Sequence, residues 1–318
     1  MTERCDPGGA AEGRRRSAGR SVRNRQRAVA ATRCGRSNTG ATSKRIRMGS
    51  GNGGMVSQFG MRLVFGLSLL WAVLPREQIS AGFFRIQCLV VLGLGVLASL
   101  AFGVGDPTDA AWPAWWSRWA VWLAGGTAAL GFVGSVLWTL QRRRGGAVCG
   151  GAILVLAASW LVLDAAAAGG GMPGVVGRAV NELLSGALLG GCVGSMLLGH
   201  WYLTAPAMSH RPLFRAIAVV GVAAAARLAY GVGAGVAGTD VLRSVLGQGA
   251  VTARAVWLGL HWLPGILGPL VMAVLAWRIM KGYGNTQAAT GVLFVAVICS
   301  FLGEMSALLL QRDVGWPL

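Results

Sequence analysis

Charged residues inside long apolar segments are the part of this sequence best suited to chemistry. Arg227 lies near the middle of an apolar segment at 213–236, and Glu304 lies within another at 288–310. Moving an ionisable group into the hydrocarbon core of a membrane costs about 2.5–3.5 kcal/mol on insertion scales, so such groups usually face a partner or a functional site. These two residues are therefore the first functional candidates.

Two further polar residues are expected at the depth of this pair. If each apolar segment is a helix that rises 1.5 Å per residue, Arg227 and Glu304 differ in depth by only ~4–5 Å, which an arginine side chain can reach across. Tyr230 and His261 fall close to the level of Glu304. Arg227, Tyr230, His261 and Glu304 thus predict one polar cluster in the outer half of the membrane. It is either a structural Arg227–Glu304 ion pair, with His261 bonded to a backbone carbonyl, or a proton- or ligand-handling site open toward the periplasm.

A second group of polar side chains lies at the end of the apolar segment 183–203 and in the turn that follows. Imidazole and phenol groups can hydrogen-bond a carbonyl, and a guanidinium can hold a phosphate. The group therefore predicts a site for a quinone headgroup or an anionic lipid head, with an ordinary interfacial belt as the alternative. Its members are His200, Trp201, Tyr202, His210 and Arg211.

Cofactor and catalytic motifs are weakly represented. His200 and His261 differ in depth by roughly 12 residues, or ~18 Å, so they cannot ligate one haem iron from its two sides. A quinone, or a haem with one histidine ligand, stays open. No CxxC pair occurs among the six cysteines, so no metal site is predicted. The absence of GxxxxGK[ST], HExxH and GxSxG motifs leaves open whether the chain is an enzyme.

The composition requires a membrane around these residues. Of the 318 residues, 54% are hydrophobic and 13% are charged, and the mean hydropathy is +0.58. Soluble globular chains carry about 25% charged residues. The composition therefore excludes a soluble enzyme, a disordered protein and a small secreted domain held by disulfides.

The distribution of apolar residues predicts an all-α polytopic transmembrane helix bundle of about eight spans. Apolar stretches of about 20 residues cross the hydrocarbon core as helices, because only then are all backbone hydrogen bonds satisfied within the segment. The first and fourth stretches are the shortest. The eight stretches are 59–75, 86–104, 119–140, 147–164, 183–203, 213–236, 255–277 and 288–310.

Two patterns indicate how these helices pack. Glycines four residues apart in the fifth segment, at Gly186, Gly190 and Gly194, predict a flat groove for a neighbouring backbone, with a bound cofactor ring as the alternative. Four tryptophans near the start of the third segment predict an interfacial aromatic belt. They are Trp112, Trp115, Trp116 and Trp119.

The positive charge is concentrated at the beginning of the chain. Residues 1–54 hold 13 of the 29 lysines and arginines and have no apolar periodicity, which predicts a disordered basic tail before a transmembrane domain at 55–318. No folded basic face, and so no nucleic-acid partner, is expected. The charge of the tail conflicts with the orientation derived next, and a physiological start at Met48 or Met55 would resolve the conflict.

Loop charges predict the orientation of the spans. We call the side of the membrane on which the first span begins side A, and we call the opposite side side B. Side B carries nine basic residues and side A six, among them Arg62 and Arg178; Asp164 and Glu182 are counted with the acids of side A. The positive-inside rule then places side B in the cytoplasm and both ends of the transmembrane domain in the periplasm of a bacterial inner membrane.

Three motifs carry a resemblance that covers most of residues 59–318. They are GFFRIQ at 82–87, GHWYLT at 199–204, and NTQAATG at 285–291 followed by GEM at 303–305. In these segments the chain resembles a family of uncharacterised bacterial multi-pass integral membrane proteins with about eight spans. The resemblance implies a compact helix bundle in an inner membrane and no particular chemistry.

Two functions follow from the two candidate sites. The first is a quinone- or respiratory-chain-linked membrane component that uses His200, Tyr202 and His210. The alternative is a transporter or proton-conducting protein that uses Arg227, His261 and Glu304. The expected partners are the lipid bilayer and other members of a membrane-protein complex.

Overall fold

The protein is an all-helical transmembrane bundle. The computed structural model describes residues 51–103, 112–169, 171–205, 208–237 and 251–314. Within these ranges there is no strand, and eight helices are long and apolar enough to cross a membrane. The predicted fold class is therefore confirmed. The predicted tail at 1–54 lies almost entirely outside the described residues.

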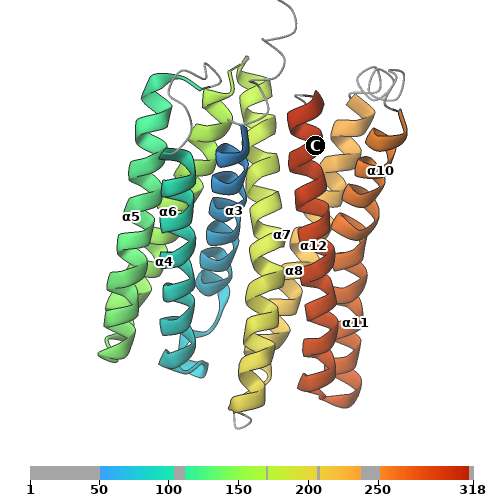
Figure 1. Cartoon of the computed structure of the whole chain (residues 1–318). Coiled ribbons are helices and arrows are strands. Elements are labelled where there is room, and N and C mark those ends of the chain that lie inside the picture. The colour runs from blue at the N-terminus through green and yellow to red at the C-terminus, as the bar shows by residue number, and fades with distance from the viewer. Residues whose placement is uncertain (1–50, 104–111, 170, 206–207, 238–250, 315–318) are drawn as a thin grey trace, which may run out of the picture. The chain divides into compact units, whose positions relative to one another are not determined.

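The described helices lie side by side and together form one compact unit, residues 52–318 (Figure 1). A short 3₁₀ turn, η2, lies between α3 and α4, and a π-helical turn, η3, joins α10 to α11 into one span. The elements are α3 Gly51–Val73, η2 Arg76–Gln78, α4 Ala81–Gly103, α5 Ala114–Thr139, α6 Arg143–Ala167, α7 Met172–Thr204, α8 Arg211–Ala237, α10 Val251–Trp262, η3 Leu263–Leu267, α11 Gly268–Tyr283 and α12 Thr286–Val314.

The fifth span differs most from its predicted extent. The apolar pattern indicated 183–203, whereas α7 already begins at Met172. The polar residues Asn181 and Glu182 interrupt the apolar pattern, but both side chains are buried inside the protein, with 2% of their surface exposed. Hydropathy scales describe the transfer of a side chain from water to lipid. An apolar pattern therefore ends where a helix carries polar residues that face other helices, although the helix itself continues.

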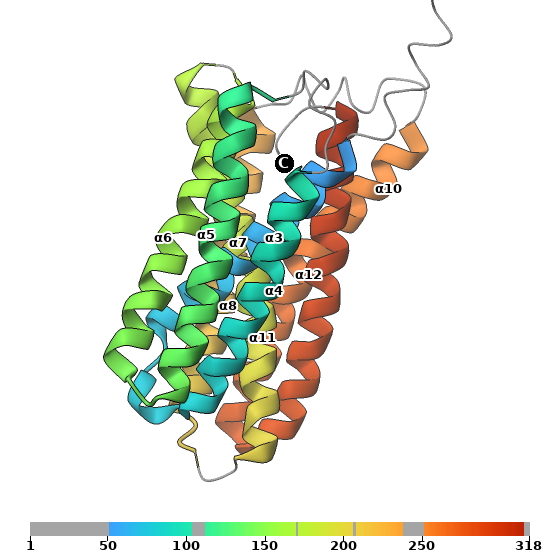
Figure 2. The ribbon, with the colours of Figure 1, turned by 60° about the vertical axis from the view of Figure 1, so that its left-hand side comes forward.

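Helices α3 and α7 form the centre of the bundle. Two thirds of the residues in their most apolar windows are buried, whereas no other span exceeds 44%. In Figure 1, α4, α5 and α6 lie on one side of this pair, and α8, α10, α11 and α12 lie on the other. Figure 2 shows α3 among α4, α7 and α12. Side chains on α3 and α7 can therefore meet groups from both sides.

The glycine groove on α7 is filled by α3. A Cβ atom on Gly66 would overlap the backbone of Gly186 and Gly190, and a Cβ atom on Gly190 would overlap the backbone of Gly66 and Leu67. Only glycine allows two helix backbones to approach this closely. A cofactor ring, the alternative considered for this groove, has no room there.

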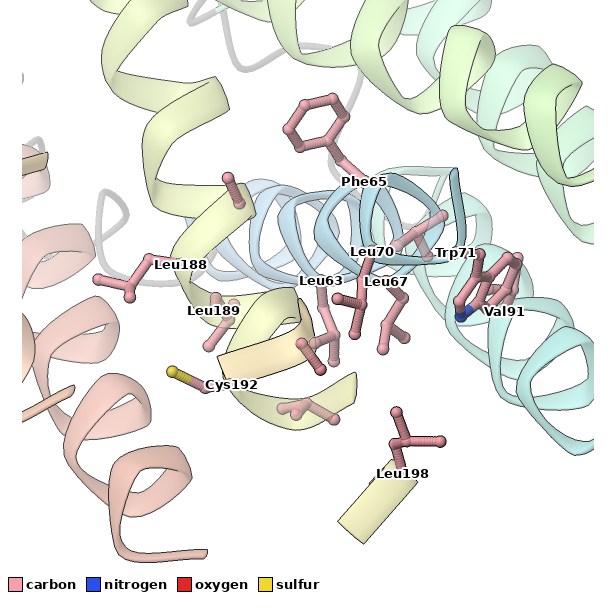
Figure 3. Packing of buried hydrophobic residues seen from close by; sticks show 14 of the residues in the cluster. Leu63, Phe65, Leu67, Leu70, Trp71, Val91, Leu188, Leu189, Cys192 and Leu198 are labelled. Atoms are coloured by element: carbon pink, nitrogen blue, oxygen red, sulfur yellow. The ribbon is translucent and has the colours of Figure 1, made fainter. Parts of the chain in front are cut away.

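An apolar core surrounds the α3–α7 contact. Leu63, Leu67 and Leu70 from α3 pack with Leu188 and Leu189 from α7 (Figure 3). The cysteines of the described part of the chain are free, and Cys88, Cys149 and Cys192 are buried. They contribute to the core as small apolar side chains.

The seventh span is irregular at its prolines. The π-helical turn Leu263–Leu267 contains Pro264, and Pro269 follows at the start of α11. Within this turn Gly265 approaches Gly303 of α12 so closely that a Cβ atom on either glycine would overlap the other residue. Since π-helical turns are frequent at functional sites, this irregularity directs attention to His261, which lies just before it.

The α3–α7 contact yields a stability prediction. We expect Gly190→Ala to lower the free energy of unfolding by about 1–3 kcal/mol, because the added methyl group must push α3 away. Gly93→Ala is the matched control: it lies in the interior of α4, and a Cβ atom there meets nothing within 4 Å. The control should be neutral or stabilising by up to about 1 kcal/mol, since alanine favours helix. Unfolding of both variants in mixed detergent micelles measures the difference; equal stabilities would contradict the prediction.

Candidate functional site: a buried charge network

A bidentate ion pair joins α3 to α7. The Nε atom of Arg62 donates to Oε2 of Glu182 at 2.7 Å, and its Nη2 atom donates to Oε1 at 2.6 Å. Arg62 precedes Gly66 by one helical turn, and Glu182 precedes Gly186 by one turn, so all four lie on the facing surfaces of the two helices. The close approach of the backbones at the glycines thus places the two charged groups in contact.

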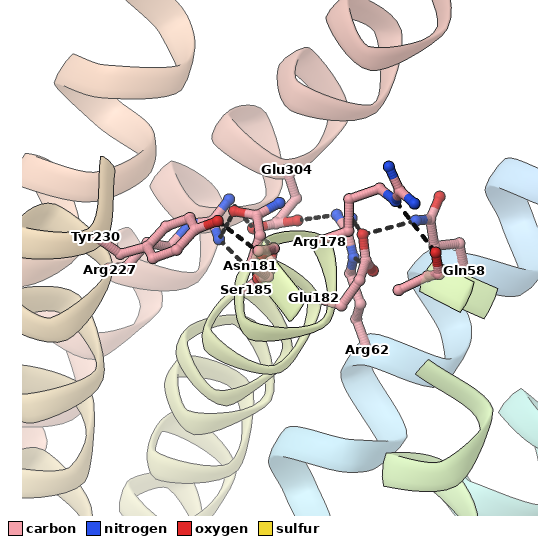
Figure 4. A network of polar contacts seen from close by, with 11 residues as sticks. Gln58, Arg62, Arg178, Asn181, Glu182, Ser185, Arg227, Tyr230 and Glu304 are labelled. Carbon is pink, nitrogen blue, oxygen red and sulfur yellow. Dashed lines mark hydrogen bonds and ion pairs between the residues drawn. The ribbon is translucent and has the colours of Figure 1, made fainter. Parts of the chain in front are cut away.

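The same arginine reaches α12. Its Nη1 atom donates to Oε2 of Glu304 at 2.7 Å. The hydroxyl of Ser185 donates to the other oxygen of Glu304, and the side-chain amide of Gln58 donates to Oε1 of Glu182 at 2.9 Å. Arg62 therefore holds two carboxylates from two different helices (Figure 4).

A second arginine contacts Glu304 from α8, and its geometry is looser. The Nη1 atom of Arg227 donates to the backbone oxygen and to Oδ1 of Asn181, both at 3.1 Å. Its Nη2 atom lies 3.6 Å from Oε1 of Glu304. That nitrogen is buried and makes no hydrogen bond within the described part of the chain. Arg227 is therefore attracted to Glu304 without being bonded to it.

These four charged residues form what we call the Arg–Glu network: Arg62, Glu182, Arg227 and Glu304. At most 4% of each side chain is exposed. Two positive and two negative charges balance, which is the condition for burying charge at tolerable cost, because an unpaired ion inside a protein is strongly destabilising. The network connects α3, α7, α8 and α12 at one level of the bundle.

The structure brings the four residues of the predicted cluster to this network. Arg227 and Glu304 are in direct contact, as described above. The hydroxyl of Tyr230 donates to the backbone oxygen of Gly177 on α7 at 2.6 Å. The Nδ1 atom of His261 lies 3.3 Å from the backbone oxygen of Gly303, the residue next to Glu304.

Sequence reasoning missed half of the network. Arg62 and Glu182, together with Asp164, were counted as loop charges of side A, yet they are 1%, 2% and 4% exposed and lie within transmembrane helices. That assignment was wrong, because distance from a loop does not reveal the direction in which a side chain points. Without Arg62, side A retains five basic residues against nine on side B.

One residue of the expected tryptophan belt also has a different role. Trp116 is fully buried, and its indole Nε1 atom donates to Oδ1 of Asp164 at 3.1 Å. Trp115 and Trp119 are exposed at 44% and 59%, as residues facing lipid are. The belt interpretation is therefore wrong for Trp116, whose helix position turns it toward α6.

The second predicted site offers fewer free groups than its composition indicated. The indole of Trp201 donates to Oγ of Ser80 at 2.8 Å. The hydroxyl of Tyr202, a buried residue, donates to the backbone oxygen of Ser209 at 2.5 Å. Both polar atoms are thus used within the protein, and the exposed members are His200, His210 and Arg211.

The GFFRIQ, GHWYLT and NTQAATG segments meet at the end of α7, whereas GEM contributes Glu304 to the Arg–Glu network. A Cβ atom on Gly199 would lie 2.5 Å from Oγ1 of Thr290, and one on Gly82 would lie 3.3 Å from the ring of Trp201. The ring centroids of Phe83 and Trp201 are 6.0 Å apart. These segments therefore pack α4, α7 and α12 together at the side B end, and their small and aromatic residues have a structural explanation.

Metal binding has no support in the described ranges, where no group of three or more histidine, cysteine, aspartate or glutamate side chains could hold an ion. No family model, curated protein or solved structure matches the chain. The function must therefore be argued from the chemistry of the Arg–Glu network.

The geometry of the network predicts unequal roles for its two arginines. We expect Arg62→Gln to lower the free energy of unfolding by about 3–5 kcal/mol, because it leaves two buried carboxylates without their main donor. Arg227→Gln should cost less, about 1–3 kcal/mol, because a glutamine amide can still donate to Asn181. Arg118→Gln, at an exposed position of α5, should change stability by less than about 1 kcal/mol. Unfolding in mixed micelles checks the order, and a larger loss for Arg227→Gln would contradict it.

Proposed function

We propose that the protein is a proton-conducting membrane protein and that the Arg–Glu network carries the proton through the bundle. The supporting observation is the asymmetry of its arginines: Arg62 is fully bonded, whereas a buried nitrogen of Arg227 is held near Glu304 only by charge. Ionisable groups at membrane depth commonly mark ion or proton pathways.

Protonation of Glu304 provides the step that moves charge. When a carboxylate oxygen of Glu304 takes up a proton, its negative charge is removed and the attraction that holds Nη2 of Arg227 is lost. Arg62 keeps its bidentate partner Glu182, so α3 and α7 stay together. Arg227 then keeps only the neutral contacts to Asn181, and α8 is free to shift relative to α12. Release of the proton restores the ion pair.

The surroundings of Glu304 support such a shift. Its neighbour Gly303 packs against Gly265 in the π-helical turn of the seventh span. His261 contacts the backbone of Gly303 and places an imidazole beside the residue that precedes Glu304. Interrupted helices beside ion-binding groups are a recurring feature of membrane transporters.

The proposed setting is a bacterial inner membrane. Eight apolar helices require a lipid bilayer around the protein. With nine basic residues on side B and five on side A, we infer that side B faces the cytoplasm and that the beginning of α3 and the end of α12 face the periplasm.

A quinone- or respiratory-chain-linked component of a membrane complex is the second candidate. It is favoured by the exposed side chains of His200, His210 and Arg211 at the side B end of the bundle. The rings of Tyr202 and His210 lie 6.3 Å apart. This function requires a bound quinone or haem, so the two candidates differ in a directly measurable property.

Proton conduction is tested in liposomes. We expect purified protein to dissipate an imposed pH gradient, measured with an entrapped pH-sensitive dye, and Glu304→Gln to slow it at least tenfold (about 1.4 kcal/mol). Glu77→Gln, at an exposed position in η2, should conduct like the unchanged protein.

Folded protein that does not conduct, or a fully active Glu304→Gln variant, would contradict proton conduction by the network. An oxidised-minus-reduced spectrum and a quinone extraction of the same sample test the second candidate. A haem band or stoichiometric quinone would favour it.

Orientation is tested by labelling introduced cysteines in intact cells, in a chain whose Cys5 and Cys34 are replaced by alanine. Ala168→Cys lies in the exposed link between α6 and α7 on side A, and Tyr283→Cys lies at the exposed end of α11 on side B. A membrane-impermeant maleimide should label the first variant in intact cells and the second only after lysis. The reverse pattern would invert the proposed orientation.

A further inference from the structure

One buried carboxylate stands outside the Arg–Glu network. Asp164 lies on α6 and is 4% exposed. Its Oδ1 atom accepts one hydrogen bond, from the neutral indole of Trp116 at 3.1 Å. Within the described residues no lysine, arginine or histidine nitrogen forms an ion pair with it. Asp164 therefore differs from Glu182 and Glu304, each of which is in contact with an arginine.

The charges around Asp164 do not balance a carboxylate. The network is neutral without it, so an ionised Asp164 adds an uncompensated negative charge to the interior. The charged groups that face it are Glu182 from α7, which repels it, and Arg62 from α3, which is already bonded to two carboxylates. Arg178, also on α7, donates instead to the backbone oxygens of Ala165 and Gly169. An isolated buried carboxylate of this kind is stabilised by taking up a proton.

The position of Asp164 places it between the network and side A. It lies three residues before the end of α6, whereas Glu182 lies ten residues after the start of α7. At 1.5 Å per residue, Asp164 is therefore on the order of 10 Å closer to the side A end of the bundle. A proton that enters from side A would meet Asp164 before it meets Glu182.

We propose that Asp164 is the proton-loading group of the protein: it takes up a proton from water on side A and supplies it toward the Arg–Glu network. Uptake at Oδ2 converts the carboxylate into a neutral acid, while Oδ1 keeps its hydrogen bond from Trp116. Release of that proton toward the network re-forms the Asp164 carboxylate, so each cycle of uptake and release moves one proton. The onward transfer rests on the proposed function, whereas proton binding by Asp164 does not.

Infrared spectroscopy of the full-length protein in liposomes tests proton binding without any assay of transport. We expect a carbonyl stretching band of a protonated carboxylic acid in acidic buffer that weakens in alkaline buffer and shifts in D₂O. Asp164→Asn should remove the band, and its amide oxygen can still accept the indole hydrogen bond, so the fold should be retained. Trp116→Phe should shift the band to higher frequency, because the carbonyl loses its donor. Glu77→Gln is the exposed-carboxylate control and should leave the band unchanged.

The outcomes separate this inference from the proposed function. If Asp164→Asn removes no band, or if the band neither responds to pH nor exchanges with D₂O, proton loading at Asp164 is wrong. If the unchanged protein conducts protons and Asp164→Asn conducts equally fast, it is also wrong. If the band behaves as expected and the unchanged protein does not conduct, the proposed function fails while proton binding by Asp164 stands. At least a tenfold loss of conduction in Asp164→Asn, restored by Asp164→Glu, supports both.

Discussion

The close contact of the α3 and α7 backbones is the constraint on which the rest of this structure depends. Gly66 and Gly190 bring the two helices closer than any side chain would allow. Arg62 lies one turn before Gly66 and Glu182 two turns before Gly190, and the two side chains meet in a bidentate pair that depends on this separation of the backbones. Packing and electrostatics thus require the same geometry, and the central helices cannot rotate or slide without losing both.

Charge balance then determines which other helices can join this centre. A buried Arg62–Glu182 pair is neutral, and Arg62 has one further nitrogen, Nη1, whose hydrogen bond Glu304 of α12 accepts. The added negative charge requires a second cation, and Arg227 of α8 supplies it at a looser distance. Buried ion pairs contribute little net stability compared with apolar packing, but losing one partner is severe. The network therefore specifies which helices are neighbours more than it adds to the free energy of unfolding.

The loose contact between Arg227 and Glu304 and the lack of an ion pair at Asp164 are two departures from fully paired charges among the described residues, and each involves a carboxylate that can take up a proton. Asp164 accepts a hydrogen bond from a neutral indole, whereas Glu182 and Glu304 contact an arginine. The Nη2 atom of Arg227 has only an ionic neighbour, whereas each side-chain nitrogen of Arg62 is hydrogen-bonded to a carboxylate. The backbone hydrogen bonding of the bundle is irregular at the π-helical turn, which packs next to Glu304. The proton conduction that we propose would use all three features together.

The sequence by itself determined the all-α, eight-span architecture, because the thickness of the hydrocarbon core and the need to satisfy every backbone hydrogen bond leave few alternatives for such apolar segments. It also placed Arg227 and Glu304 at similar depth, since depth follows from residue count and helical rise. Only the tertiary structure decided which way each side chain points around its helix. That rotation turned Arg62, Glu182 and Asp164 from expected loop charges into buried partners, because hydropathy averages over a helix and does not distinguish a face toward lipid from a face toward protein.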